Sequence, residues 1–155
     1  MPTWTQADAT CDIFTFKAGL LSAVGHDLQL KCTRFSLTVE DGAVSGTFDG
    51  TAIEVVGAVK NGFVQASALS DKDKRDIVKN IRTGVFKRHD ASGIRFECDE
   101  LEEDGDTLEG EGTLTIPPGE HDIDFEVSID GDKAVCEVTL HQPHWGIAPF
   151  KALMG

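Results

Sequence analysis

Four two-residue turn signals divide this chain: Asp41-Gly42, Asn61-Gly62, Asp104-Gly105 and Asp130-Gly131. Asn-Gly and Asp-Gly tolerate the positive φ angles of a tight β-hairpin, so each pair is expected to reverse the chain and to pair the strands on either side. Three of the four signals are flanked on both sides by residues that alternate between apolar and polar. The sequence therefore predicts an antiparallel meander.

Alternation is cleanest in the C-terminal half. One face of the segment 108–116 carries Leu108, Gly110, Gly112, Leu114 and Ile116, and one face of the segment 123–129 carries Ile123, Phe125, Val127 and Ile129. The intervening residues are acidic or hydroxylated. One buried and one solvated face on each strand is typical of an antiparallel up-and-down barrel or of a sandwich. A chain of 155 residues is expected to form one domain, residues 1–155.

The N-terminal half contains shorter apolar patterns. Residues 11–18 predict a strand with Phe14 on its apolar face. Residues 28–39 predict one long strand whose apolar phase slips near Arg34, and we interpret this slip as a β-bulge. The pair Asp49-Gly50 fits equally a further hairpin or a kink within one strand.

One short amphipathic α-helix is expected over residues 70–83. Ser70 suits the N-cap because its hydroxyl can accept hydrogen bonds from the free amides of the first turn, and Gly84 suits the stop. The helix would carry a narrow apolar stripe of Ile77, Val78 and Ile81. A helix of this kind can cover one opening or one flank of a sheet.

Composition limits the partners. The net charge of −13 repels the phosphate backbone of nucleic acids, so we expect no nucleic-acid partner. No segment approaches the roughly 20 apolar residues that span a bilayer, so we expect no membrane insertion. The N-terminus has neither the basic start nor the apolar run of a secretory signal, which predicts a cytoplasmic protein as written, or a periplasmic one if the chain is a processed form. The oligomeric state stays open, and a dimer is compatible with the sequence.

Charge is distributed unevenly along the chain. Half of the 14 basic residues lie between positions 72 and 88, and acidic residues are concentrated from Glu97 to Glu111. Both runs fit solvated surface. An alternative is that part of the basic run stands near one mouth of the barrel and attracts an anionic lipid head group, chiefly through Arg75, Lys79, Arg82, Lys87 and Arg88.

The four cysteines are far apart in sequence and form no CxxC pair, so no metal or redox motif is indicated. Cys98 and Cys136 are in phase with apolar neighbours. We therefore expect both to pack as small buried hydrophobic side chains, with the thiols of the protein reduced.

Candidate catalytic residues are few. His26 and Asp27 are adjacent, and adjacent residues of a strand point to opposite faces, which makes them a poor acid–base pair. His141 and His144 have an HxxH spacing that also places them on opposite faces of a strand, and Pro143 between them suggests an irregular loop. We predict no metal site, no cofactor and no catalytic residue, and hence a protein that is not an enzyme.

Several positions expected to point inward carry small side chains: Gly57, Ala66, Ala68, Gly110 and Gly112. A barrel of about eight strands is just wide enough to be filled by side chains or to hold one slender ligand, and small residues favour the ligand. The same glycines would also permit bends at barrel corners. Both interpretations stay open at this point.

Segments along nearly the whole chain resemble the YceI-like lipid-binding (polyisoprenoid-binding) family. They are residues 14–28 with the GHDL motif (Gly25 to Leu28), the helix 71–81, the segments 93–97 and 110–116, and residues 145–155 with the WGIAPF motif (Trp145 to Phe150). The resemblance implies a lipocalin-like antiparallel barrel whose apolar interior holds a long isoprenoid or similar lipid, without catalytic residues. His26 and Asp27 match the His-Asp pair of the family and are interpreted as a structural or polar site.

The hypothesis is a protein that binds, transports or stores an apolar chain, polyisoprenoid or fatty-acyl, in the interior of the barrel. The ligand-binding residues are predicted to be Phe14, Phe16, Leu28, Leu30, Gly57, Ala66, Gly110, Gly112, Leu114, Phe125 and Val127. One alternative is a histidine-dependent enzyme or metal-binding barrel, which would require two or more histidines to converge in one pocket. Another is a scaffold or stress-response protein with a filled core.

Overall fold

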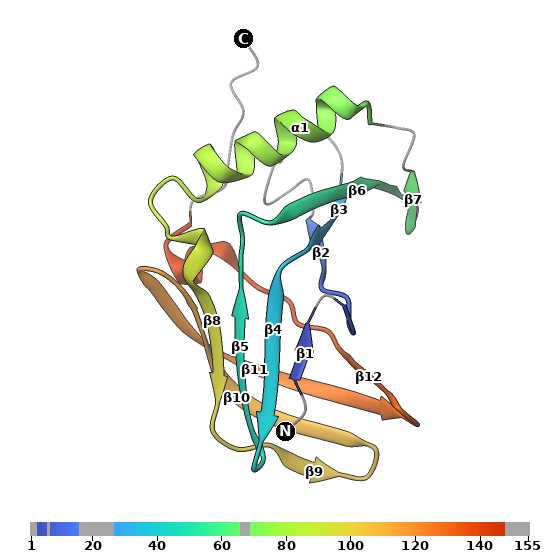
Figure 1. The fold of residues 1–155 in the computed structure, drawn as a ribbon, viewed down its shortest axis with the longest axis vertical. Coiled ribbons are helices and arrows are strands. Elements are labelled where there is room, and N and C mark those ends of the chain that lie inside the picture. The colour runs from blue at the N-terminus through green and yellow to red at the C-terminus, as the bar shows by residue number, and fades with distance from the viewer. Residues whose placement is uncertain (1–2, 6, 16–26, 66–68, 148–155) are drawn as a thin grey trace.

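The computed structural model describes residues 3–5, 7–15, 27–65 and 69–147, and most of these residues form antiparallel β-strands (Figure 1). The strands curl around one side of the core, and a single α-helix lies above them. The structure therefore confirms the predicted all-β, barrel-like fold with one short helix. No helix of the described residues is both long enough and apolar enough to cross a membrane.

The strands are β1 (Thr3–Thr5), β2 (Asp12–Thr15), β3 (Asp27–Cys32), β4 (Phe35–Glu40), β5 (Ala43–Phe48), β6 (Ile53–Lys60), β7 (Phe63–Gln65), β8 (Ile94–Cys98), β9 (Glu102–Asp104), β10 (Thr107–Ile116), β11 (Gly119–Asp130) and β12 (Lys133–Cys136). The helix α1 spans Asp71–Asn80. Shorter helical turns are the π-helical turn Ile81–Val85 and the 3-10 turns Ala91–Gly93 and Gln142–Trp145.

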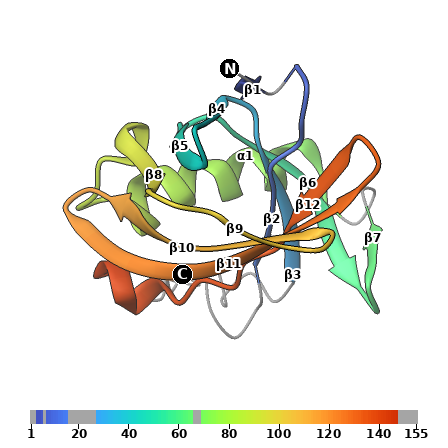
Figure 2. The same ribbon diagram turned by 90° about the horizontal axis from the view of Figure 1, so that it is seen from below.

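Two sheets share these strands. The larger sheet has the order β1-β4-β5-β8-β10-β11-β12, with β9 paired to β10, and the smaller sheet has the order β2-β3-β6-β7. Viewed from below, the hairpin β10–β11 curves across the near side of the molecule and α1 lies behind it (Figure 2). No ladder within the described residues joins the two sheets, so they form an open barrel.

The chain changes sheets four times within the described residues, and two of these crossings lie where the sequence pattern is ambiguous. The segment predicted as one strand, 28–39, is two strands, because the chain leaves the smaller sheet after Cys32 and enters the larger one at Phe35. The phase slip near Arg34 marks this crossing. A register shift does exist nearby, but it lies between Gln29 and Leu30 in the pairing of β3 with β6. Asp49-Gly50 lies at the next crossing, between β5 and β6.

All four predicted turns join neighbouring antiparallel strands. Asp41 and Gly42 have φ angles of 52° and 78°, and Asn61 and Gly62 have φ angles of 52° and 80°. These values place both residues of each turn in the left-handed region that a two-residue hairpin requires. In the other two turns the glycine alone has the positive φ angle, 63° at Gly105 and 66° at Gly131.

The helix α1 begins as predicted, and a π-helical turn carries the helical segment past its predicted stop. The Ser70 hydroxyl accepts from the Asp73 amide at 3.0 Å, and the Asp73 carboxylate accepts from the Ser70 amide at 3.1 Å, which forms a capping box. Ile77 and Ile81 of the predicted stripe are buried. The chain does not stop at Gly84, because the π-helical turn Ile81–Val85 continues the helix. In Figure 1, α1 runs along β6.

One hydrophobic core joins both sheets, the helix and the C-terminal 3-10 turn. Its buried members are Leu28, Leu30, Val55, Ala58, Leu69, Ile77, Ile81, Val85, Phe96, Cys98, Leu114, Ile116, Trp145 and Ile147. The indole nitrogen of Trp145 donates to the Leu114 carbonyl oxygen at 2.8 Å, inside the core. Trp145 thereby fastens the C-terminal turn to β10.

Two phenylalanines fill the space that Gly110 and Gly112 leave. The rings of Phe96 and Phe125 meet edge to face, with centroids 5.3 Å apart. A Cβ on Gly112 would overlap the Phe96 ring and lie 2.7 Å from the Glu97 carbonyl oxygen. The expectation that these two glycines leave room for a ligand is therefore wrong, because aromatic side chains occupy that room.

We expect Gly112→Ala to destabilise the protein by about 1–3 kcal/mol, because its Cβ meets backbone as well as a buried ring. Gly110→Ala is the matched control, because its Cβ would lie 2.9 Å from the tip of the Phe125 ring and 3.0 Å from the Cys98 sulfur, both ends of side chains. It should lose less stability. Urea unfolding of both variants measures this, and an equal loss in the two would contradict the packing.

Candidate ligand-binding surfaces

Apart from Phe14, the predicted lining residues are buried, half-buried or outside the described residues. Leu28, Leu30, Gly57, Gly112 and Leu114 are buried, and the leucines belong to the core as predicted. Gly110, Phe125 and Val127 are half-buried, and Phe125 packs against the core. Phe16, Ala66 and His26 lie outside the described residues, as does Ala68.

The prediction for Phe14 is wrong. Its side chain is 54% exposed. Ile13 pairs with Leu30 across β2 and β3, so Ile13 and Thr15 take the inner face and Phe14 points away from the core. Asp27 begins β3 and is half-buried.

The inner face of the larger sheet becomes progressively less covered along β11. Ile123, Phe125 and Val127 are half-buried, and Ile129, on the same face, is 38% exposed. Val127 pairs with Cys136 and therefore places Cys136 on this face too. Cys136 is exposed, so the expectation that it packs in the core is wrong. The inner face is covered at one end of the sheet and open at the other.

The smaller sheet opens in the same way at β7. Lys60 lies on the same face of β6 as the buried Ala58, and Phe63 pairs with Lys60. Phe63 therefore belongs to the inner face, yet its side chain is 71% exposed. We use the name open side for this uncovered part of the inner faces, formed by Phe63, Val127, Ile129 and Cys136.

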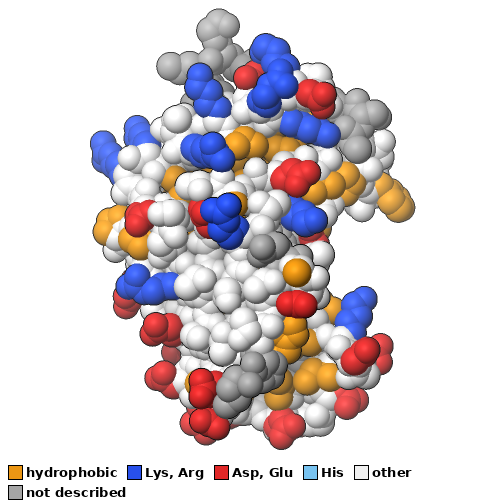
Figure 3. Space-filling view, viewed as in Figure 1, with side chains coloured by type: hydrophobic (Ala, Val, Ile, Leu, Met, Phe, Trp, Pro, Cys, Tyr) orange, Lys and Arg blue, Asp and Glu red, His pale blue; other side chains and the backbone are white. Residues whose placement is uncertain are grey.

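The space-filling view shows the molecule hollowed on its right, between the part that carries β6 and β7 and the part that carries the β11–β12 hairpin (Figure 3). Hydrophobic side chains appear on both rims of this hollow. The hollow lies at the open side. Phe63 belongs to β7 and Cys136 belongs to β12, and these are the last strands of the two sheets.

A second surface is a groove of about 700 Å³ between α1 and β6. Its apolar lining is Ile53, Val55 and Val78, and its cationic lining is Lys74, Arg75, Lys79 and Arg82, beside Glu54 and Asp71. Within the described part of the chain, no carboxylate lies within ion-pair distance of these four cations. Three of the five basic residues singled out in the sequence therefore line one groove, whereas Lys87 and Arg88 are exposed elsewhere.

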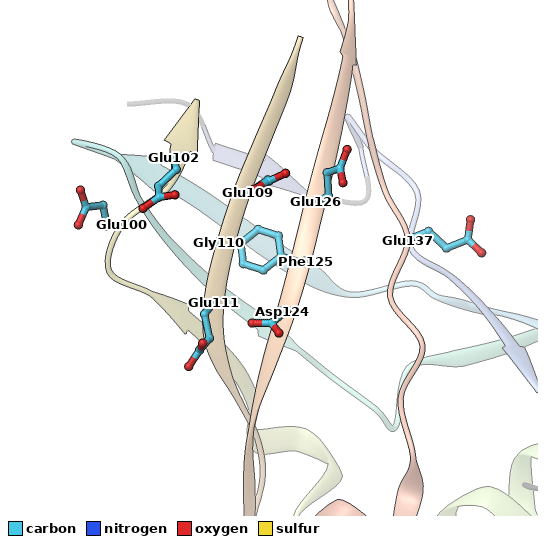
Figure 4. A pocket seen from close by; sticks show the side chains of 9 residues that line it. All are labelled: Glu100, Glu102, Glu109, Gly110, Glu111, Asp124, Phe125, Glu126 and Glu137. Atoms are coloured by element: carbon cyan, nitrogen blue, oxygen red, sulfur yellow. The ribbon is translucent and has the colours of Figure 1, made fainter. Parts of the chain in front are cut away.

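A third surface is acidic (Figure 4). Carboxylates surround the Phe125 ring in this view and line a hollow of about 640 Å³; they belong to Glu100, Glu102, Glu109, Glu111, Asp124, Glu126 and Glu137. The strand register brings three of these carboxylates together, because Glu109 lies directly opposite both Glu102 and Glu126. Like charges in directly opposite positions repel and weaken strand pairing.

Three histidines converge at the C-terminal 3-10 turn. The rings of His121 and His144 are stacked with centroids 4.0 Å apart, and the rings of His141 and His144 are 5.6 Å apart. The pKa of His144 is lowered by desolvation and by the neighbouring His121 and His141. His141 and His144 do not lie on opposite faces as they would on a strand, because the segment around Pro143 is a 3-10 turn. No three His, Cys or carboxylate groups of the described residues are already arranged around one point as metal ligands.

No protein-family model matches this chain, and no curated protein sequence matches it. The resemblance to the YceI-like family therefore stays a prediction.

Proposed function

We propose that this chain binds a lipid-like molecule with a long apolar chain, such as a polyisoprenoid or a fatty-acyl derivative, and carries or stores it. The observation that supports the proposal is the open side, where inner-face residues Phe63 and Ile129 are exposed. The resemblance of the sequence to a lipid-binding family supports the same class of ligand.

The energetics favour an apolar occupant of the open side. Covering apolar surface releases about 25 cal/mol per Å², and soluble proteins rarely leave large apolar patches uncovered without a partner. The inner-face residues Phe125, Val127 and Ile129 follow one another along β11 at intervals of about 7 Å. A row of this kind matches the shape of an extended hydrocarbon chain.

The test is a fluorescence titration with a long-chain fatty acid that carries a fluorophore. Phe63→Ser and Ile129→Ser, made together, should weaken binding by at least about tenfold, because each removes apolar contact area from the open side. Val64→Ser and Val135→Ser form the matched control, since these exposed residues lie on the opposite faces of β7 and β12. Equal binding by both double variants would contradict the proposal.

The groove between α1 and β6 favours an anionic head group. Its cations lie beside apolar side chains and lack carboxylate partners among the described residues. Planar guanidinium groups such as that of Arg75 suit phosphate oxygens.

Arg75→Gln with Lys79→Gln should weaken binding of a long-chain alkyl phosphate by about two- to tenfold at low salt. The effect should fade at high salt, where counter-ions screen the charges. Lys87→Gln with Arg88→Gln is the control, because it removes the same charge outside the groove. If the alkyl phosphate and the alcohol with the same alkyl chain bind equally well, the groove does not bind the head group. The proposed apolar site on the open side is unaffected by that result.

A second candidate function is metal binding, favoured by the convergence of His121, His141 and His144. Neutral imidazole is a common ligand of Zn²⁺, and the lowered pKa of His144, caused by desolvation and by the neighbouring His121 and His141, favours the neutral form of that ring. The His121 ring would have to turn out of its stack to share an ion with the other two.

Calorimetric titration with Zn²⁺ tests this candidate. His144→Ala should abolish binding, because His144 lies between the other two rings. Absence of Zn²⁺ binding by the unaltered protein, or equal binding by the unaltered protein and the variant, would eliminate the histidine site.

A further inference from the structure

Two of the four cysteines are neighbours across a pair of strands. The Cys32 amide donates to the Cys11 carbonyl oxygen at 2.9 Å, and the next residues, Asp12 and Lys31, are register partners of β2 and β3. The Cys32 thiol also lies 3.4 Å from the Arg34 carbonyl oxygen and 3.5 Å from the Asp49 carbonyl oxygen, and a hydrogen bond between the Cys11 and Cys32 thiols shifts the pKa of both. Their separation in the sequence concealed this contact.

Both thiols lie on the inner face of the smaller sheet. Cys32 continues the buried row of Leu28 and Leu30, and Cys11 continues the row of Ile13 on β2. Cys32 is buried, whereas Cys11 is half-buried and lies just before the first residue of β2. A small reagent can therefore reach the pair from the side of Cys11.

We propose that Cys11 and Cys32 form a reversible cross-strand disulfide, with a low-molecular-weight disulfide such as oxidised glutathione as the oxidant. The inference is independent of the proposed lipid ligand. Paired residues that exchange a backbone hydrogen bond have Cα atoms about 5.5 Å apart, which is within the range that a disulfide spans.

The reaction proceeds by two exchanges. The Cys11 sulfur attacks one sulfur of glutathione disulfide while its proton passes along the hydrogen bond to the Cys32 thiolate; the S–S bond of the reagent breaks, and one glutathione leaves as its thiolate. The leaving thiolate takes up this proton from Cys32. The Cys32 thiolate then attacks the Cys11 sulfur, the bond from Cys11 to glutathione breaks, and the second glutathione leaves as its thiolate. The protein, which begins as one thiol and one thiolate, loses two electrons and one proton, and the reagent becomes one glutathione thiol and one glutathione thiolate.

The local electrostatics support reactivity at neutral pH. The hydrogen bond from Cys11 lowers the pKa of Cys32 to about 6, helped by backbone hydrogen bonds at Arg34 and Asp49 and opposed by burial and by the Asp49 charge. The same hydrogen bond raises the pKa of Cys11. The pair therefore loses its first proton more easily than an isolated cysteine does. Partial desolvation, by contrast, raises the pKa of the Cys136 thiol.

The disulfide would fasten β2, an end strand of the smaller sheet, to β3. Closing the loop between residues 11 and 32 restricts the unfolded chain. We expect oxidation to raise the melting temperature by roughly 5–10 °C.

The experiment equilibrates the protein with defined ratios of reduced and oxidised glutathione, quenches with acid and maps disulfides by mass spectrometry without reduction. The unaltered protein and the control Cys98→Ser with Cys136→Ser should both yield one linked pair of peptides, containing Cys11 and Cys32, and lose it in reductant. Cys32→Ser should instead retain one glutathione on Cys11.

Three results would overturn the inference. They are four free thiols at high oxidised glutathione, a bridge that involves Cys98 or Cys136, and stable glutathionylation of Cys11 in the unaltered protein without closure by Cys32. Because every readout is a covalent mass change, the outcome does not depend on lipid binding.

Discussion

The buried indole of Trp145 determines which end of the molecule is closed. Its nitrogen donates to the Leu114 carbonyl oxygen, and its own carbonyl oxygen accepts from His89 Nε2 at 2.8 Å. Gly119 permits this contact, because a Cβ there would overlap the Trp145 backbone. The strands β10 and β11 are therefore covered where they join each other. Their opposite ends, at Leu108 and Ile129, are less buried, and the open side is the consequence.

Charge divides the surface in a way that fits this asymmetry. Carboxylates cluster along β9, β10 and β11, where Glu109 faces glutamates on both sides. Cations gather between α1 and β6. An anionic ligand approaching this protein is repelled by the first surface and attracted by the second, so electrostatics would direct its approach although the net charge is −13.

Local signals in the sequence were reliable where local physics decides the outcome. The hairpin turns depend on backbone preferences of Asn, Asp and Gly, and the start of α1 depends on Ser70, so all were predictable. The prediction for Phe14 failed because β2 is short and has an apolar residue on each of its faces. Only the pairing of β2 with β3 places Ile13, and not Phe14, in the core. The prediction that Cys136 is buried failed because the alternation of apolar and polar residues shows which face of the strand a residue is on, but not whether other residues cover that face.

Contacts between distant residues escaped sequence analysis for a related reason. Gly110 and Gly112 suggested empty space, but the phenylalanines that fill it come from β8 and β11. His121 joins His141 and His144 only because Trp145 docks the C-terminal turn against β10 and β11. The pairing of Cys11 with Cys32 likewise required the register of β2 and β3. Each of these contacts depends on tertiary pairing that no short motif encodes.

The most direct measurement of the central claim is photo-crosslinking with a long-chain fatty acid that carries a photoreactive group near the end of its chain, followed by peptide mapping. The open side predicts labelled residues in β7 and in the β11–β12 hairpin, with label on Phe63, Val127, Ile129 or Cys136. Competition by the unlabelled fatty acid should remove it. Label confined to the groove between α1 and β6, or label that the competitor does not displace, would contradict a lipid site on the open side.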